Sequence, residues 1–302
     1  MPESVLAEEQ ARGSFDGVAV TSEGAPLAFV SQAAPGANTG RAWDVTAGVA
    51  IGPPIPDFPA DHAGWAFGAP AGSPLVAWTH RDRVHVHDLG TGHEATVEGE
   101  PELLGLTVHG GRPAVAAVFG PASDAEVVVW DALTGDPLTE FGVWLGHRTA
   151  VGRCVLHATP ATGPLIGVPG DAALSILDVE RGEEITTLPP SHAVLAPSPD
   201  GLVVVQAGES GLDVRGLDGD RLAVLTAPSP CDQIAAAQAG GGLLVAVVPR
   251  DDPAAVLVWN AAAPAPAHRV EIASPVNDLA VAPDGTLLVA TDAGLHQARL
   301  RP

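Results

Sequence analysis

The sequence predicts an all-β protein, a seven-bladed β-propeller with four-stranded antiparallel blades that fills one domain of residues 1–302. Three observations support this fold. Short apolar strands that end in a polar turn recur every 38–47 residues, about 42 on average, and propeller blades repeat at about 40–45 residues. The 35 Gly and 29 Pro are spread among these strands, which is typical of many turns. Hydrophobic residues make up 46% of the chain, enough for a packed core.

An equivalent strand end marks each predicted blade in turn. Each marker closes a short, mostly apolar run, and an Asp or Asn follows it in most repeats. In chain order the markers are Trp43, His87, Trp130, Leu177, Arg215, Trp259 and Ala298. The blades that contain them span approximately residues 13–60, 61–100, 101–145, 146–190, 191–228, 229–272 and 273–302, and residues 3–10 complete the last one.

The last predicted blade lacks one strand. After Ala298 only Arg299–Pro302 remain, which is too short for another strand. An open sheet edge carries unpaired backbone groups and invites aggregation. We therefore expect Ser4–Ala7 to supply the missing outer strand, so that the N-terminus closes the ring.

Turn residues repeat in the same register as the strand ends. Acidic residues lie six positions upstream of the marker in four repeats, at Asp124, Asp171, Glu209 and Asp292, and one position off at Asp82 and Asp252. An acidic side chain in a tight turn accepts backbone N–H bonds. Histidines precede the first strands of the second, fourth and fifth repeats, at His62, His147 and His192. Residues 198–201 and 282–285 both contain Pro-Asp-Gly, which favours a hairpin turn.

With these features the sequence resembles the WD40-repeat family, in degenerate form, over its full length. The resemblance rests on Gly146-His147, on the Ser-Pro-Asp-Gly turn at 198–201, on the acidic turn residues and on the Trp-Asp pairs at 43–44 and 130–131. In that family the His, the turn Asp, a Ser or Thr and the Trp form a structural hydrogen-bond network. The resemblance therefore implies one network with His147 and Asp171, and another with Asp124 and Trp130.

Repetition favours a structural role for the residues that recur, because catalysis needs one asymmetric constellation rather than several copies. On this ground we interpret ten residues as structural: His62, His147, His192, Asp124, Asp171, Glu209, Asp292, Trp43, Trp130 and Trp259.

Charge and composition exclude several classes of partner. The net charge is −22, which argues against nucleic acid and against anionic membranes. Solubility is one interpretation of this charge, and a basic partner is the other. The N-terminus lacks a secretory signal and no run of about 18 apolar residues is present, so we expect a cytoplasmic protein. The excess of Ala, Gly and Pro, with Arg in place of Lys, is typical of a bacterial sequence.

The densest histidine cluster lies between residues 79 and 93. His85 and His87 point the same way on a strand, but a metal ion needs further ligands, so we interpret them as structural and predict no metal or cofactor. Motifs of phosphate-binding loops and hydrolases are absent from the sequence. The alternative function is an enzyme or small-molecule-binding propeller of bacterial secondary metabolism, with a site at the channel mouth. Its candidate catalytic residues are His80, Asp82, His85 and His93.

The sequence favours a non-enzymatic scaffold that binds a protein or peptide on one face of the disc, as a monomer or as a subunit of a larger complex. Buried aromatic anchors supply much of the energy of protein interfaces, and loop cations can meet an acidic peptide or a phosphate. The candidate partner-binding residues are Trp65, Trp144, Arg81, Arg148 and Arg153. Packing between blades and solvated surface charge are the alternative roles of these residues.

Overall fold

A computed structural model describes most of the chain, and its strands account for nearly all of the regular structure in that part. The described residues are 3–6, 8–21, 26–33, 38–59, 64–120, 125–143, 155–159, 163–169, 173–189, 193–198, 201–208 and 211–300. They divide into two compact units, one made of Met1–Ala60 with His192–Pro302 and the other of Asp61–Ser191. That the chain forms one domain stays a prediction.

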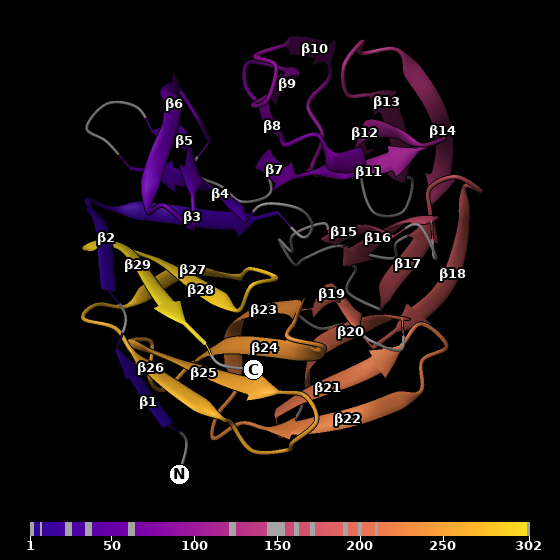
Figure 1. The fold of residues 1–302 in the computed structure, drawn as a ribbon. Helices are drawn as coiled ribbons and strands as arrows, with labels where there is room; N and C mark the ends of the chain where they lie inside the picture. The colour runs from indigo at the N-terminus through magenta and orange to yellow at the C-terminus, as the bar shows by residue number, and fades with distance from the viewer. Residues whose placement is uncertain are drawn as a thin grey trace. The chain divides into compact units, whose positions relative to one another are not determined.

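The described residues of the unit that contains both chain ends form four sheets (Figure 1). The first sheet is β3 (Phe15–Val20), β4 (Leu27–Gln32), β5 (Thr39–Asp44) and β6 (Val49–Pro56). The second is β19 (Ala193–Ser198), β20 (Gly201–Gly208), β21 (Gly211–Gly216) and β22 (Arg221–Thr226). The third is β23 (Cys231–Ala239), β24 (Gly242–Pro249), β25 (Ala255–Asn260), β26 (His268–Glu271) and β1 (Glu3–Leu6). The fourth is β27 (Val276–Val281), β28 (Thr286–Thr291), β29 (Gly294–Arg299) and β2 (Glu8–Arg12).

The described residues of the other unit form three sheets of four strands, and a 3₁₀ turn, η2 (Pro70–Gly72), lies between the first two strands. The first sheet is β7 (Trp65–Gly68), β8 (Leu75–Thr79), β9 (Arg83–Asp88) and β10 (Glu94–Glu98). The second is β11 (Leu103–His109), β12 (Arg112–Phe119), β13 (Ala125–Asp131) and β14 (Pro137–Val143). The third is β15 (Val155–Thr159), β16 (Gly163–Pro169), β17 (Leu174–Asp178) and β18 (Glu183–Leu188).

The four-stranded sheets are antiparallel, and in most of them the strands follow one another in chain order, which is the blade of a β-propeller. The prediction of seven four-stranded blades is wrong in its count: the described residues form six sheets of four strands and one sheet of five. The reason lies at the N-terminus. β1 adds to the free edge of β26 as a fifth strand and runs parallel to it.

The strand that completes the β27–β29 sheet comes from the N-terminus, but from a later segment than predicted. β2 (Glu8–Arg12) pairs antiparallel with β29, from Glu8 opposite Gln297 to Arg12 opposite Gly294. The predicted segment Ser4–Ala7 lies earlier, and Ser4 is opposite Arg269 on β26. The short N-terminal segment thus serves two sheet edges, where the sequence alone gave reason to expect one.

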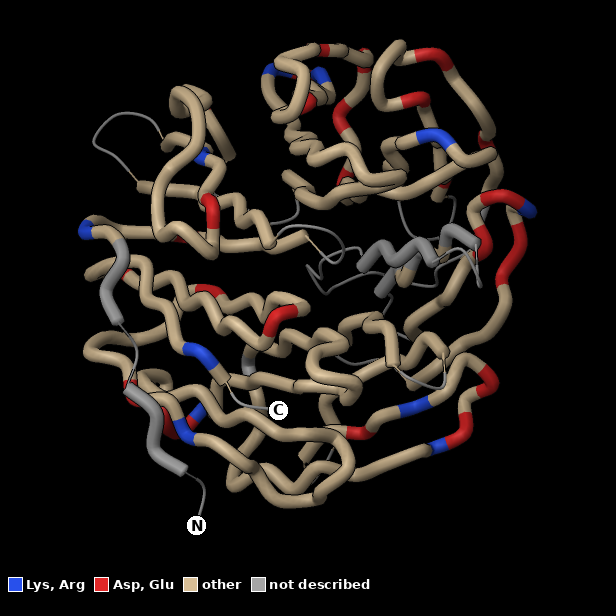
Figure 2. The backbone as a smooth tube through the Cα atoms, viewed as in Figure 1, with Lys and Arg blue, Asp and Glu red and all other residues tan. Residues whose placement is uncertain are grey.

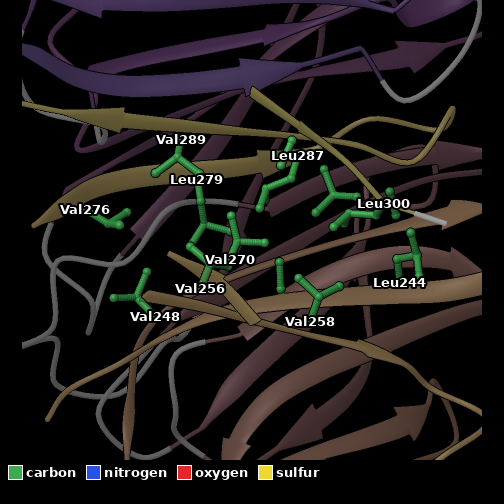
Figure 3. Close-up of a cluster of buried hydrophobic side chains, with 14 of the residues drawn as sticks. Leu244, Val248, Val256, Val258, Val270, Val276, Leu279, Leu287, Val289 and Leu300 are labelled. Carbon is green, nitrogen blue, oxygen red and sulfur yellow. The ribbon is translucent and has the colours of Figure 1, made fainter. Parts of the chain in front are cut away.

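The core lies between neighbouring sheets, and the β27–β29 sheet shows this because both of its faces are covered. On β28, which is buried along its whole length, Leu287 and Val289 pack against the β24–β26 strands, as Figure 3 shows. Leu288 and Ala290 point the other way and pack against β3–β5. Side chains alternate between the faces of a strand, so a strand buried on both faces is continuously apolar. Figure 2 marks the charged residues of the chain, and β24 and β28, which are buried along nearly their whole length, contain none.

Within the described part of the chain no helix is long and apolar enough to cross a membrane.

Candidate functional site

The hairpin turn between β8 and β9 displays two charged side chains in an unfavourable backbone conformation. His80 N–H donates to Arg83 O at 2.9 Å, and Arg83 N–H donates back to His80 O at 3.2 Å. The two residues between them, Arg81 and Asp82, have φ of 50° and 60°. Positive φ at both central residues is the type I′ turn, which normally takes Asn-Gly. An ordinary residue there costs on the order of 1 kcal/mol, and such strain is concentrated at functional sites.

The same turn is fixed from its sides. Gly99 N–H donates to the carbonyl of Asp82 at 2.9 Å, which ties the turn to the chain segment after β10. Arg83 lies 3.6 Å from the Glu98 carboxylate on β10. Arg81 and Asp82 are exposed, and no described carboxylate forms an ion pair with Arg81. The guanidinium of Arg81 is therefore presented to solvent on a rigid turn, which is suited to meeting an anionic group of a partner.

The candidate catalytic histidines do not form one group. His85 stacks on Trp78 with ring centroids 5.2 Å apart, and the His80 ring is 6.1 Å from His85. His93 lies in the turn at the opposite end of β9, where its Nε2 is 2.6 Å from Leu133 O. β9 is six residues long and so separates the two ends by roughly 16–20 Å. The structure brings His80, Asp82 and His85 to one end of the sheet and leaves His93 at the other.

The environment of His85 favours a neutral, packed ring. Burial lowers the pKa of His85, with the nearby His80 and Arg83 charges acting in the same direction and the backbone of His80 and the Glu94 carboxylate opposing. His87 instead pairs with Glu94, with 3.2 Å between Nδ1 and Oε1. Among the described residues no group of three or more His, Cys, Asp or Glu side chains is arranged to hold a metal ion.

Of the predicted partner-binding residues, Arg81 is the exposed one in the described chain. Trp65 begins β7, lies opposite Trp78 and is only 5% exposed, so its ring is not available as a surface anchor in this conformation. Trp144, Arg148 and Arg153 lie outside the described residues.

The residues interpreted as structural are described only in part. His62, His147, His192, Asp124, Asp171 and Glu209 lie outside the described residues, so the hydrogen-bond networks implied by the family resemblance stay predictions. Trp43, Trp130 and Trp259 are buried on the third strands of their sheets. Trp259 Nε1 donates to Pro264 O at 3.3 Å, and Trp130 meets Phe119 edge-on at 5.8 Å.

Asp292 belongs to a polar network that the sequence did not predict. Its Oδ1 accepts hydrogen bonds from Asn277 Nδ2 at 2.8 Å and from Ser14 Oγ at 3.0 Å. Asn277 Nδ2 also donates to Phe15 O at 3.0 Å. These two donors, Asn277 first, hold the pKa of Asp292 below its ordinary value. The network links the starts of β3 and β27 to the turn that follows β28.

A recurring bulge places Asn277 of this network. The pairing register of the first strand shifts at its second residue in three sheets, and the residues skipped are Asp16, Asp232 and Asn277. A bulge re-aims a side chain and leaves it out of the ladder. The signal is present in the sequence as an Asp or Asn placed directly after Phe15, Cys231 and Val276. This signal lies in the first strand of each sheet, whereas the repeat was identified from the end of the third strand.

The chain is similar in structure to solved propellers with WD40 repeats. A structure described as "Structure of U3-55K" aligns with a TM-score of 0.64 at 14% identity, covering 95% of this chain and 96% of that chain. The "Crystal structure of RRP9 WD40 repeats" aligns with a TM-score of 0.64 at 15% identity, covering 96% of this chain and 95% of that chain. No protein-family model and no curated protein sequence matches the chain. At these identities the likeness shows the fold alone, and it confirms the predicted β-propeller.

Proposed function

We propose that this protein is a non-enzymatic scaffold that binds a protein or peptide partner at the face of the propeller where the 80–83 turn lies. The observation that carries the proposal is the pair of exposed, strained residues Arg81 and Asp82. Propellers with WD40 repeats typically act as interaction scaffolds, which agrees with this function. A turn that served stability alone would be better built with Asn-Gly.

Charge indicates the kind of partner. A protein of net charge −22 attracts a basic partner over long range and repels an acidic one, which affects mainly the rate of association. Arg81 adds a short-range preference, because a guanidinium binds a carboxylate with good geometry. We therefore expect a partner that is basic overall and places a carboxylate against Arg81.

The proposed site is tested by one substitution and a matched control. Asn adopts the left-handed conformation easily, so Arg81→Asn removes the guanidinium and keeps the turn. Arg181 is also exposed, but it lies in the turn between β17 and β18, the third and fourth strands of their sheet. The 80–83 turn joins a second and a third strand, so Arg181→Asn makes the same charge change in a different hairpin turn. Tagged wild-type protein and both variants are used to recover partners from a lysate of the source organism, with quantification by mass spectrometry.

We expect Arg81→Asn to reduce recovery of the main partner by about fivefold or more, which corresponds to about 1 kcal/mol. Recovery with Arg181→Asn should equal that of the wild type, and added salt should weaken all three. Equal recovery with Arg81→Asn and with the wild type would remove this turn from the binding site.

A further inference from the structure

β1 lies on the outer edge of a sheet that already has its four strands. It pairs with β26 in parallel, from Glu3 opposite His268 to Leu6 opposite Glu271. On its other side β26 pairs with β25, which completes the usual four-strand set of β23–β26. β1 therefore covers an edge and is not needed to complete a blade.

The edge beneath β1 is preformed. Val270 of β26 is fully buried and belongs to the cluster with Val256 and Leu279 that Figure 3 shows between two sheets. Arg269 points away from this cluster and pairs with the carboxylates of Asp252 and Glu271. Because these contacts do not involve β1, the edge keeps its shape when β1 leaves.

β1 itself is held weakly. It has only four residues, and parallel pairing is slightly less stable per residue than antiparallel pairing. Ordering each residue of a strand costs conformational entropy, which a short strand on an outer edge recovers poorly. A weakly held strand on a preformed edge exchanges readily with a competitor for the same hydrogen bonds.

Three other outer strands carry residues that hinder strand addition. β6 contains Pro53, Pro54 and Pro56, which lack the N–H that a ladder needs. β10 carries Glu at both ends, and β18 begins with two Glu. Charged and proline residues are the usual means of blocking an edge. β26 has no proline, and its Arg269 is neutralised by two carboxylates. The outer edge of β26 is instead covered by β1.

We propose that the outer edge of β26 is a docking site for an extended segment of a partner protein, added as a parallel strand, and that β1 covers this site in the same chain. The seated residues Glu3–Leu6 define the ligand: four or more extended residues whose backbone pairs with His268–Glu271, with an aliphatic residue opposite Val270 as Val5 is. Main-chain hydrogen bonds supply affinity in this mode of recognition and side chains supply specificity. This site shares no residue with the 80–83 turn, so a negative result for one proposal does not contradict the other.

The first test releases β1 and offers a peptide in its place. In the full chain, Ser4→Pro/Val5→Pro removes two adjacent N–H groups, and neighbouring residues of a strand point their N–H groups to opposite sides, so one donor to β26 is lost. Ser4→Ala/Val5→Ala changes the same positions and keeps the donors. The probe is a fluorescent peptide of residues 1–7, followed by anisotropy, and a peptide with Pro at positions 4 and 5 is the control probe.

We expect the proline variant to bind the probe about tenfold more tightly than the alanine variant. While β1 occupies the site, the apparent Kd of the probe equals the intrinsic Kd divided by the fraction of molecules in which the site is open. The control probe should bind neither variant. Equal binding by the two variants, or no binding by the proline variant, would overturn the proposal.

A second test does not depend on the proline variant folding. Partner residues on paired strands are close enough for a disulfide, so Ser4→Cys/Arg269→Cys, with Cys154 and Cys231 changed to Ser, locks β1 on β26 when oxidised. The probe should bind the reduced protein and not the oxidised one; equal binding in both states refutes the proposal. As a further arm, a chain that carries only Ser4→Cys is mixed with a chain that carries only Arg269→Cys. A disulfide between these two chains would show that a second copy of this protein occupies the edge, which would overturn the proposal of a different partner protein.

Discussion

A single exposed carboxylate joins three segments of the chain at Asp292. Its donors, Asn277 and Ser14, come from β27 and from the residue before β3, nearly the whole length of the sequence apart. Both donors stabilise the ionised form, so the pKa of the carboxyl group is lower in the folded protein than in the unfolded chain. The network then contributes stability that is complete above the ordinary Asp value of 3.8 and is lost as the pH falls through the lowered pKa.

Asn277→Ala should raise the pKa of Asp292 towards 3.8, because Asn277 is the stronger of the two causes. Ser14→Ala should raise it less. The carboxyl carbon of Asp292, followed by NMR over pH 2–6, measures both shifts, and Asn38→Ala is the control, since Asn38 contacts Asp16 at 3.4 Å instead. The stability lost in Asn277→Ala should also shrink as the pH falls below 3.8. An Asp292 pKa that is the same in wild type and Asn277→Ala would show that the network does not hold the carboxylate.

At the scale of the element, the acidic residue that ends the third strand explains why the repeat can be recognised in the sequence. Asp88, Asp131 and Asp178 each accept two backbone N–H bonds, from the residues two and three positions on, at 2.8–3.1 Å. Asn260 accepts one at the equivalent place, from Ala262 at 3.2 Å. A side chain that closes the next turn marks the end of a strand, so the sequence shows this register in the repeats that have an Asp or Asn there.

Asp131→Ala should destabilise the protein by about 1–2 kcal/mol, because two partly buried hydrogen bonds from backbone N–H groups lose their acceptor. Asp131→Asn should cost much less, since its amide oxygen accepts the same bonds, as Asn260 does. Urea unfolding of the three proteins at pH 7 measures the difference. An Asn variant as unstable as the Ala variant would mean that charge, including the 3.8 Å contact with Arg112, matters more than the turn.

What the sequence could not show depends on pairing rather than on pattern. The strained Arg81-Asp82 turn looks like any polar turn, because a left-handed conformation is imposed by the hairpin and the sequence shows no Gly there. The bulge at Asn277 is one residue long and does not disturb the repeat spacing. The position of β1 rests on a parallel pair with β26, more than 260 residues away, and periodicity carries no information about it.

At the scale of the whole molecule, the stability of one sheet depends on the sheets beside it and on distant parts of the chain. The β27–β29 sheet buries one face against β24–β26 and the other against β3–β5. Its fourth strand, β2, comes from the opposite end of the sequence, with Glu8 opposite Gln297. Closing a loop this long costs entropy that grows only slowly with length, so the pairing needs few contacts to be favourable.

Two N-terminal deletions separate the roles of β1 and β2. Removing residues 1–12 deletes both strands, opens the edge of β29, and takes Ala11 away from the cluster that contains the buried Leu295. We expect a fall in melting temperature of roughly 6–12 °C, from a loss of about 3 kcal/mol at 2–4 °C per kcal/mol. Removing residues 1–6 deletes only β1 and should lower it by much less, because β26 remains packed through Val270. Calorimetry of both deletions and the full chain decides this. If the two deletions melt together, or if neither differs from the full chain, β2 does not stabilise the sheet.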